Sequence, residues 1–387
     1  MSVPERIPFA SPDIGEAEIE AAVEAMRSGW LTTGPRAAAF EKEFAESLGG
    51  GVEAIAVNSA TAGLHLALEA LGIGPGDEVL VPDWTFTSTA EVVRYLGATP
   101  VMVDVLAGTL NLDLTAAARA VTERTRAVIP VHFAGLPVPR TALARFARDH
   151  GLLVVEDAAH AHPCLSEGLP IGTGDSKCVV FSFYATKTMT TGEGGMVVTA
   201  DPEVARRIRT MRLHGISRDV FDRYSSSLPS WHYEVVAPGF KYNLTDPAAA
   251  IGRVQLERSG SMRDRRAAIA ERYLDAFSDL PLTLPACATD PGDEHTWHLF
   301  VLRLAHPTVD RNSFIEAMSE LGVLCSVHFI PLHLHPYWRD SGELRPEDFP
   351  VAQESFEHAV SLPIFSAMTD EQVERVVAAV RTVLSGN

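Results

Sequence analysis

One lysine stands where its amine could act as a covalent nucleophile. Lys187 follows the apolar run 178–183 (CVVFSF), and it precedes a glycine-rich turn, 192–195 (GEGG), and a second apolar run, 196–199. Such runs are typical of buried strands, and glycine permits a tight bend between them. Burial lowers the pKa of a lysine, and a free amine can form a Schiff base with a carbonyl cofactor. An ordinary loop lysine is the alternative interpretation of the same pattern.

A carboxylate precedes this lysine along the chain. Asp157 ends the apolar run 152–156 (LLVVE), and small residues and His160 follow it. Open α/β sheets bind ligands at the carboxyl ends of their strands. A cofactor with a pyridine ring needs a carboxylate there, because the carboxylate keeps the ring nitrogen protonated. Taken by itself, Asp157 would be interpreted as a helix-capping residue.

A third pattern could bind an anion. The short apolar run 54–57 leads through 58–63 (NSATAG) into a helix predicted over 64–71. Unpaired N–H groups and the helix dipole favour a phosphate at such an N-terminus. The commoner role of such a turn is a helix cap without a ligand, so the pattern alone leaves both interpretations open.

Together these segments resemble the DegT/DnrJ/EryC1/StrS family of sugar aminotransferases, which use pyridoxal 5'-phosphate (PLP). The family pattern of Ser-Phe, Thr-Lys, Thr-Gly-Glu-Gly-Gly and Glu-Asp-Ala-Ala stands here at 182–183, 186–187, 191–195 and 156–159. The resemblance extends from about Phe9 to Thr382, nearly the whole chain. It implies that Lys187 holds PLP covalently and transfers protons, and that Asp157 faces the pyridine nitrogen.

The resemblance also implies a set of cofactor-binding residues. Thr61 and Ala62 match the phosphate-binding positions, and Phe86 matches the ring that stacks on the cofactor. His160 matches the position on the other face of that ring, where many relatives carry glutamine. Ser182 belongs to the set through the Ser-Phe motif.

Further matches concern the substrate and a second subunit. Asn243 matches an asparagine that reaches the neighbouring subunit's cofactor phosphate in a homodimer with shared active sites. Most members instead carry Asn and Arg at the positions of Lys241 and Asn243, which leaves open which of the two touches phosphate. Thr32, Lys241 and His328 match segments that border the substrate site.

Three histidines close together invite a metal interpretation. His328, His333 and His335 stand in VHFIPLHLHPYW, and histidines two apart can share one face of a strand. The prolines there favour an irregular loop, and no acidic or cysteine ligand stands close by. We therefore predict no metal site.

The elements that must position these residues follow from the apolar pattern. Strands are predicted at 54–57, 78–82, 100–105, 127–131, 151–156, 178–183 and 196–199. Helices are predicted at 16–26, 64–71, 114–121, 139–149 and 201–212. Strands that alternate with helices predict right-handed crossovers and a mainly parallel sheet of seven or so strands. The polar loop 214–233 is longer than about 15 residues, a length at which structureless loops are usually functional.

The pattern changes after residue 247. Helices are predicted at 248–256, 263–277, 310–320 and 369–384, with a strand at 298–304. We therefore predict an α/β protein with a large PLP-binding domain, 1–250, that includes an N-terminal arm, and a small C-terminal α+β domain, 251–387. The resemblance implies the aspartate-aminotransferase type of architecture, PLP fold type I.

Composition limits the partners. The 387 residues carry a formal net charge of −18, which argues against nucleic acid or an anionic membrane surface as a main partner. No run approaches the length of a membrane span, and the N-terminus lacks the apolar core of a signal peptide. Four cysteines without short paired spacing are typical of reduced thiols, so we expect a cytoplasmic protein.

These observations lead to one expected activity and two rivals. The expected enzyme moves an amino group from an amino acid, by resemblance glutamate, to a nucleotide-linked keto-sugar, a UDP- or dTDP-4-keto sugar, by a ping-pong mechanism. Segment 233–246 is similar to the family branch that forms UDP-4-amino-4-deoxy-L-arabinose, although the stretch around His328 differs from that branch. The rivals are a PLP-dependent sugar dehydratase, which would carry histidine in place of Lys187, and a non-catalytic PLP-sugar-binding regulator.

Overall fold

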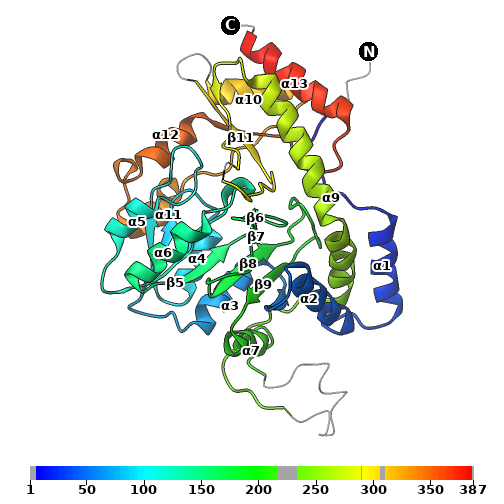
Figure 1. Cartoon of the computed structure of the whole chain (residues 1–387), viewed down its shortest axis with the longest axis vertical. Coiled ribbons are helices and arrows are strands. Elements are labelled where there is room, and N and C mark those ends of the chain that lie inside the picture. Colours follow the sequence, from blue (N-terminus) through cyan, green and yellow to red (C-terminus); the bar gives the residue numbers. More distant parts are fainter. Residues whose placement is uncertain (1–5, 217–232, 289, 306–309, 386–387) are drawn as a thin grey trace.

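A seven-stranded sheet lies at the centre of the computed structural model, which describes residues 6–216, 233–288, 290–305 and 310–385 (Figure 1). Its strands are β1 (Glu53–Val57), β2 (Glu78–Pro82), β3 (Thr99–Val103), β4 (Thr125–Val128), β5 (Leu153–Asp157), β8 (Cys178–Ser182) and β9 (Gly195–Thr199). Their order across the sheet is β1-β9-β8-β5-β4-β2-β3. Only β9 runs antiparallel to its neighbours, β1 and β8, and the other pairs are parallel. The mainly parallel sheet is therefore confirmed, with every expected strand present and small shifts at the strand ends.

Alternating side chains along the strands divide the core between two faces. Val79 and Val81 of β2 pack with α3 (Ala60–Ala70), α4 (Ser88–Tyr95) and α7 (Pro202–Met211) on one face. Leu80, between them, packs with α5 (Leu114–Ala120) and α6 (Arg140–His150) on the other. The α2 helix (Pro35–Ser47) covers the β8–β9 part of that second face. Because successive side chains of a strand point to opposite faces, both faces of the sheet are covered by helices and buried.

A smaller antiparallel sheet carries the C-terminal part of the chain. Its order is β10-β11-β12, with β10 (Leu282–Thr283), β11 (Phe300–Leu304) and β12 (Ala359–Leu362). It shares a second core with α10 (Arg311–Glu320), α13 (Asp370–Ser385) and the end of α9 (Asp246–Phe277). The remaining elements are α1 (Glu16–Arg27), α11 (Pro336–Gly342), α12 (Pro350–His358), the short hairpin β6 (Leu165–Ser166) and β7 (Leu169–Pro170), and 3-10 turns at Phe133–Gly135, Leu332–Leu334 and Pro346–Asp348.

The long α9 helix connects the two cores. The predicted pair of helices at 248–256 and 263–277 is wrong, because α9 runs unbroken for 32 residues (Figure 1). Its buried residues Gln255, Ser259, Met262 and Arg266 continue one stripe through the polar stretch between the two predicted helices, so tertiary packing overrides the local pattern. The division of the chain at residue 250 falls inside this helix and stays a prediction.

The structure also bears on the expectations about the cysteines and about membrane spans. Of the four cysteines, which all have free thiols, Cys164 and Cys178 are buried, Cys325 is half-buried and Cys287 is exposed. Among the helices that the structure describes, none is long and apolar enough to cross a membrane. Most of the expected functional loop, 217–232, lies outside the described residues.

Candidate active site

A pocket of about 450 Å³ opens where the parallel strands end. Asp157 closes β5, Ser182 closes β8, and Thr85 follows β2, so this is the sheet edge at which α/β proteins bind ligands. The C-terminal part of the chain adds the opposite wall. The lining residues are Ser59, Ala60, Thr61, Leu64, Thr85, Phe86, Ser88, Val131, Asp157, Ala159, His160, Ser182, Tyr184, Thr186, Lys187, Glu193, Gly194, His298, His328 and Phe329.

Lys187 lies in the connection between the antiparallel strands β8 and β9, as predicted. Its backbone N–H donates to Tyr184 O at 2.9 Å, and Phe183 N–H donates to Gly194 O at 2.9 Å, which closes the turn. Burial lowers the pKa of the Lys187 amine to about 8, although the charge of Asp157 opposes this shift. A much larger fraction of this amine is therefore free base near neutral pH than for an ordinary lysine, and the free base is the form that a covalent nucleophile requires.

The glycines of this turn allow a close approach to the start of α3. A Cβ on Gly195 would lie 2.8 Å from Ala60 N and from the carbonyl carbon of Ser59, and 2.9 Å from Phe181 O. All three of these are backbone atoms, which cannot move aside as a flexible side chain can. Gly195 thus lets β9 and its turn lie directly against the helix N-terminus that lines the pocket.

Asp157 is a buried carboxylate held by neutral donors. Thr89 Oγ1 donates to Asp157 Oδ2 at 2.9 Å, and Ala159 N–H donates to Oδ1 at 3.1 Å. Burial raises the pKa of this carboxyl, while these two hydrogen bonds and the charge of Lys187 act in the opposite direction. Within the described part of the chain, Asp157 has no ion-pair partner. A cationic ring nitrogen would supply that missing partner.

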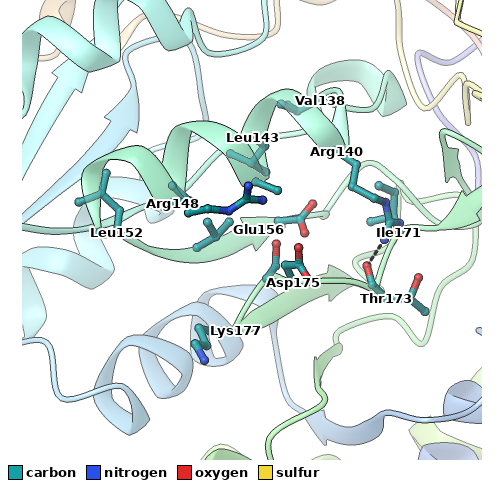
Figure 2. Close-up of a pocket in the computed structure, with 15 residues that line it drawn as sticks. Val138, Arg140, Leu143, Arg148, Leu152, Glu156, Ile171, Thr173, Asp175 and Lys177 are labelled. Carbon is teal, nitrogen blue, oxygen red and sulfur yellow. Dashed lines mark hydrogen bonds between the residues drawn. The ribbon is translucent and has the colours of Figure 1, made fainter.

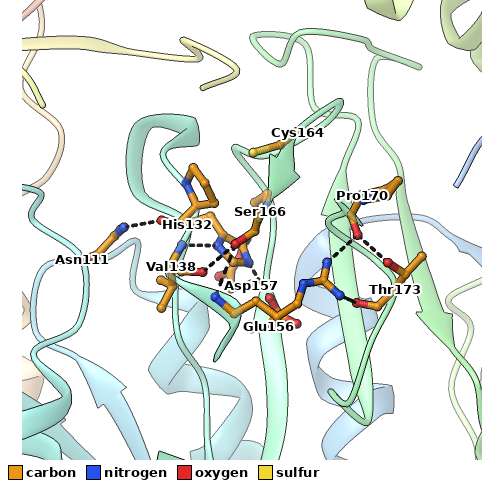
Figure 3. A network of polar contacts seen from close by, with 12 residues as sticks. Asn111, His132, Val138, Glu156, Asp157, Cys164, Ser166, Pro170 and Thr173 are labelled. Atoms are coloured by element: carbon orange, nitrogen blue, oxygen red, sulfur yellow. Dashed lines mark hydrogen bonds and ion pairs between the residues drawn. The ribbon is translucent and has the colours of Figure 1, made fainter. Parts of the chain in front are cut away.

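A polar network behind β5 fixes the end of this strand (Figure 3). His132 N–H donates to Asp157 O at 3.2 Å, and His132 Nε2 lies 2.7 Å from Glu156 Oε2. His132 Nδ1 accepts from Val138 N–H at 3.0 Å, so the proton of the ring is on Nε2 and faces Glu156. The carboxyl of Asp157 is therefore presented to the pocket by a rigid backbone.

Histidines form the wall opposite the sheet. Ala134 N–H donates to His160 Nδ1 at 3.2 Å, which places the ring proton on Nε2. Burial, and next the charge of Lys187, lower the pKa of His160 well below its ordinary value, so the ring is neutral. Burial and Lys187 likewise lower the pKa of His328 to about 4, and its Nδ1 lies 3.0 Å from Ser361 Oγ. The wall is thus polar but uncharged.

The start of α3 forms the anion-binding end of the pocket. Ser59 is the N-cap, and its Oγ accepts from Ala62 N–H at 3.1 Å. Helix geometry leaves the first N–H groups without an acceptor inside the helix. Ser59, Ala60 and Thr61 line the pocket, whereas Ala62 is buried beside it and is engaged in the cap.

Phe86 lies at the mouth of the pocket. Its side chain is 57% exposed, and its ring centroid is 6.0 Å from that of Phe329. Trp84, two residues before it, is fully buried in the core. An exposed aromatic ring beside the pocket leaves a face available for a planar ligand, which is the role expected of Phe86.

The structure separates three predicted residues from this pocket. Thr32, Lys241 and Asn243 are not among its lining residues. Asn243 forms a β-bridge with Val57, the last residue of the edge strand β1, before the Ser59 turn. Its Nδ2 donates to Thr33 Oγ1 at 2.7 Å, and its Oδ1 accepts from Lys241 Nζ. Thr32 and Lys241 are exposed. These three residues could therefore have their predicted roles only if they contact the pocket of a second subunit or a substrate that extends out of the pocket.

Two residues of the site were not identified from the sequence. His298 Nε2 lies 3.4 Å from Lys187 Nζ, although 111 residues separate them along the chain. Thr89 donates to Asp157 across 68 residues. Neither residue stands in a local motif. The one available signal was for Thr89, which lies seven residues after the predicted strand 78–82, near the sheet edge where α/β proteins bind ligands.

His333, which was predicted to lie in an irregular loop, forms a buried polar pair with Asp83. His333 Nδ1 lies 2.6 Å from Asp83 Oδ2, and both side chains are buried. His333 Nε2 lies 3.1 Å from Gln353 Oε1. Among the described residues, no group of three or more His, Cys, Asp and Glu side chains is placed to hold a metal ion.

A second cavity of about 360 Å³ lies away from this pocket, between α6 and the β5–β8 edge (Figure 2). Arg148 spans it toward Glu156, and Asp175 and Lys177 lie along its other side. Three basic side chains (Arg140, Arg148 and Lys177) and two acidic ones (Glu156 and Asp175) line this cavity, and none of the predicted site residues does.

The residues around Lys187 fit a PLP molecule. A buried carboxylate without a cation, a free amine, a helix N-terminus and an exposed aromatic ring surround one pocket of suitable size. PLP carries the complementary groups, namely a pyridine nitrogen, an aldehyde, a phosphate and a planar ring. The donor set of this pocket therefore agrees with the cofactor that the sequence implies.

Comparison with known proteins gives consistent results. The model of the DegT/DnrJ/EryC1/StrS aminotransferase family matches residues 12–381. The spore coat polysaccharide biosynthesis protein SpsC of Bacillus subtilis is 45% identical over 384 residues, which cover 98% of this chain and 97% of SpsC.

Solved structures of sugar-modifying proteins have the same fold. The candidate sugar aminotransferase Spr1654 of Streptococcus pneumoniae, in its PMP form, superposes with a TM-score of 0.92 at 33% identity, over 98% of this chain and 99% of that one. The aminotransferase PseC of Helicobacter pylori, which is involved in the biosynthesis of pseudoaminic acid, has a TM-score of 0.91 at 25% identity, over 99% and 100% of the two chains.

Proposed function

The chain belongs to the DegT/DnrJ/EryC1/StrS aminotransferase family, and from this premise we propose that it aminates a nucleotide-linked keto-sugar with an amino acid as donor. The premise also confirms three expectations. The protein is an aminotransferase, its fold is the PLP fold type I, and its cofactor is PLP. The observation that carries the proposal is the placement of the Lys187 amine, whose pKa is lowered to about 8, and the buried Asp157 carboxylate in one pocket.

Each part of the pocket has a defined task in this reaction. Lys187 would hold PLP through its amine, Asp157 would face the pyridine nitrogen, and the turn 59–61 would bind the phosphate. PLP supplies an electron sink that makes the donor's α-hydrogen acidic. Once released, the amine of Lys187 would take the proton from the donor's α-carbon and return it to the former aldehyde carbon of PLP, on the other side of the donor nitrogen, as a general acid–base. The neutral His160 would lie beside the cofactor ring without adding charge.

The substrates follow from the family and from the relatives. We propose glutamate as the amino donor, a UDP- or dTDP-4-keto sugar as the acceptor, and a ping-pong order in which donor and acceptor use the same pocket in turn. SpsC and PseC are named for polysaccharide and pseudoaminic acid biosynthesis, which supports a sugar acceptor. We further propose a cytoplasmic homodimer with shared active sites, in which Thr32, Lys241 and His328 border the substrate.

The experiment has two stages. The protein loaded with PLP should show a visible absorbance band that borohydride bleaches, and glutamate alone should yield 2-oxoglutarate in a single turnover. Amination is then assayed across UDP- and dTDP-linked 4-keto and 3-keto sugars. Lys187→Ala should lose both the band and turnover, because one amine serves both tasks. Normal transamination by that variant would contradict the proposal.

The same assay decides the remaining alternative. A PLP-sugar-binding regulator would bind PLP but would not release 2-oxoglutarate from glutamate. We favour the enzyme because the lysine, the carboxylate and the anion-binding turn all meet in one pocket. Absence of the glutamate half-reaction in protein with a full cofactor load would refute the aminotransferase proposal.

A further inference from the structure

A buried histidine lies against the amine of Lys187. His298 is 6% exposed, and its Nε2 is 3.4 Å from Lys187 Nζ. Its ring centroid is 4.3 Å from that of His160. His298 Nδ1 is buried and has no hydrogen-bond partner among the described residues. The ring therefore has one polar contact, which is the contact to Lys187.

An unusual backbone arrangement presents His298 to the pocket. Trp297, the residue before it, has φ +52°, a left-handed conformation that costs energy for a bulky residue. Arg266 of α9 holds this bend, because its Nη1 donates to the carbonyls of Trp297 and His298 at 3.3 Å and of Ile364 at 2.8 Å. A buried guanidinium is thus committed to three carbonyl groups, and Asp13 is the acidic residue whose charge raises its pKa against the effect of burial.

We propose that His298 is a positioning residue, whose imidazole holds the free amine of Lys187 in place for proton transfer. The inference rests on the proposed function, because it concerns the amine that carries the proton. Lysine has a flexible four-carbon side chain, so a released amine needs a partner to stay aligned with the donor's α-carbon. A contact of 3.4 Å is long for a hydrogen bond, and catalytic contacts of this kind tighten when substrate is bound.

A neutral ring can serve both protonation states of the amine. Burial, and then the charges of Lys187 and Arg266 and the neighbouring rings of His160 and His328, lower the pKa of His298 well below its ordinary value. When Lys187 is an ammonium, it donates to Nε2. When Lys187 is a free amine, the other tautomer donates from Nε2 to the amine. His298 can therefore hydrogen-bond to either protonation state of Lys187 by changing its tautomer, and it stays neutral in both.

The charged and titratable groups around this amine define what a variant should change. Asp157 raises the pKa of Lys187, whereas burial and the Arg266 charge lower it. A hydrogen bond to an ionised donor is stronger than one to a neutral donor, so His298 favours the ammonium form. Loss of His298 in a pocket that stays dry should lower the Lys187 pKa.

The first measurement uses apoprotein, so that it does not depend on activity. The lysines of the chain are Lys42, Lys177, Lys187 and Lys241, so acylation of each can be followed by peptide mass spectrometry against pH. His298→Leu keeps the volume and removes the hydrogen bond. It should lower the midpoint of Lys187 acylation by about 0.5–1 pH unit. His298→Gln, whose amide reaches the position of Nε2, should keep the midpoint.

The second measurement is the glutamate half-reaction with PLP bound. His298→Leu should lower kcat by about 10- to 100-fold with KM within about twofold, because alignment and not ground-state binding is lost. In His298→Asn the side chain is too short for its amide to reach Lys187, so kcat should fall as far as in His298→Leu. This second variant keeps the test valid if the leucine variant does not fold. His298→Gln should recover to within about tenfold of wild type.

His162→Leu is the matched control. His162 is also buried and its Nε2 also lacks a partner, but its ring packs on Phe44 and it does not line the pocket. It should change neither measurement. Wild-type kcat and midpoint in His298→Leu would overturn the inference, as would an equal loss in the glutamine variant, which would indicate packing alone. A wild-type protein without a half-reaction would refute the proposed function, while the acylation midpoints would still test the contact.

Discussion

Asp157 illustrates why a buried carboxylate is kept without a partner. Burial raises its pKa, and the neutral donors Ala159 and Thr89 oppose this together with the charges of Lys187 and His132. A buried charge without a close partner is costly in the protein alone. The cost is removed when a cationic ring nitrogen binds, so the same carboxylate favours the protonated ring that the chemistry needs.

We predict that Asp157→Asn folds and binds PLP but transaminates poorly. An amide has nearly the same shape and can still accept from Thr89, yet it cannot hold a proton on the ring nitrogen by charge. The rate of the glutamate half-reaction should fall by about 10²–10³-fold. Stopped-flow absorbance gives the rate, and equilibrium dialysis gives cofactor binding. A near wild-type rate would remove Asp157 from the mechanism.

The sequence identified some residues of the site but not others, for a physical reason. Lys187 and Asp157 each stand beside a strand, so local pattern and family resemblance both point to them. His298 acquires its position from a left-handed bend at Trp297 and from Arg266 on a distant helix. No local pattern encodes such a contact, because it forms only when two cores are packed against each other.

The elements on either side of the pocket are joined by a buried pair. Asp83, at the end of β2, meets His333 through the side chain at 2.6 Å and through His333 N–H at 2.9 Å. Trp338 Nε1 donates to Thr87 Oγ1 at 3.0 Å nearby. Because Phe86 lies between Asp83 and Thr87, these contacts hold the mouth of the pocket between the β2 turn and the C-terminal segment.

We predict that His333→Asn destabilises the protein in a pH-dependent manner. Burial disfavours the His333 cation, but the hydrogen bond and charge of Asp83 outweigh this and raise its pKa. Burial also raises the pKa of Asp83, which limits the charged pair at low pH. In the range from pH 6 to 9 the stabilisation is therefore present below the unfolded His333 pKa of about 6.5 and is lost as pH rises through the folded value. At pH 6 the variant should lose about 3–5 kcal/mol in urea unfolding, and less at pH 9.

A second buried pair provides the control for this pH dependence. Glu18 of α1 pairs with Arg258 of α9 and accepts from Gln255 Nε2 at 2.7 Å. Burial is outweighed by these hydrogen bonds, which lower the pKa of Glu18, so it stays charged from pH 6 to 9. Glu18→Gln should lose stability equally at both pH values. An equal loss at both pH values in His333→Asn would show that the His333–Asp83 pair does not titrate as proposed.

At the scale of the whole molecule, the pocket lacks the charge that its ligand needs. Among the described lining residues, Lys187 is the one basic side chain apart from neutral histidines, whereas Asp157 and Glu193 are acidic. The chain as a whole carries a net charge of −18. In a single subunit, the N-terminus of α3 and the neutral hydroxyl groups of the lining would therefore have to hold a cofactor phosphate without any basic side chain other than Lys187. Lys241 and Asn243 do not line the pocket of their own subunit.

This separation leads to a prediction about assembly. If Asn243 serves the partner's cofactor phosphate, mixing inactive Lys187→Ala with impaired Asn243→Ala subunits should restore activity. In a heterodimer one site then carries both lesions and the other carries none. Random pairing makes half of the dimers mixed, so activity should recover to about a quarter of wild type.

The outcome depends on how much Asn243 contributes to phosphate binding. One hydrogen bond to a charged phosphate contributes about 1.5–3 kcal/mol, enough to impair Asn243→Ala by tenfold or more. Thr33→Val, which removes the hydroxyl that Asn243 contacts within its own subunit, controls for local disruption. Subunit exchange is verified with tagged chains. If Asn243 acted within its own subunit, every site of the mixture would keep one lesion, and no recovery despite exchange would reject the shared site.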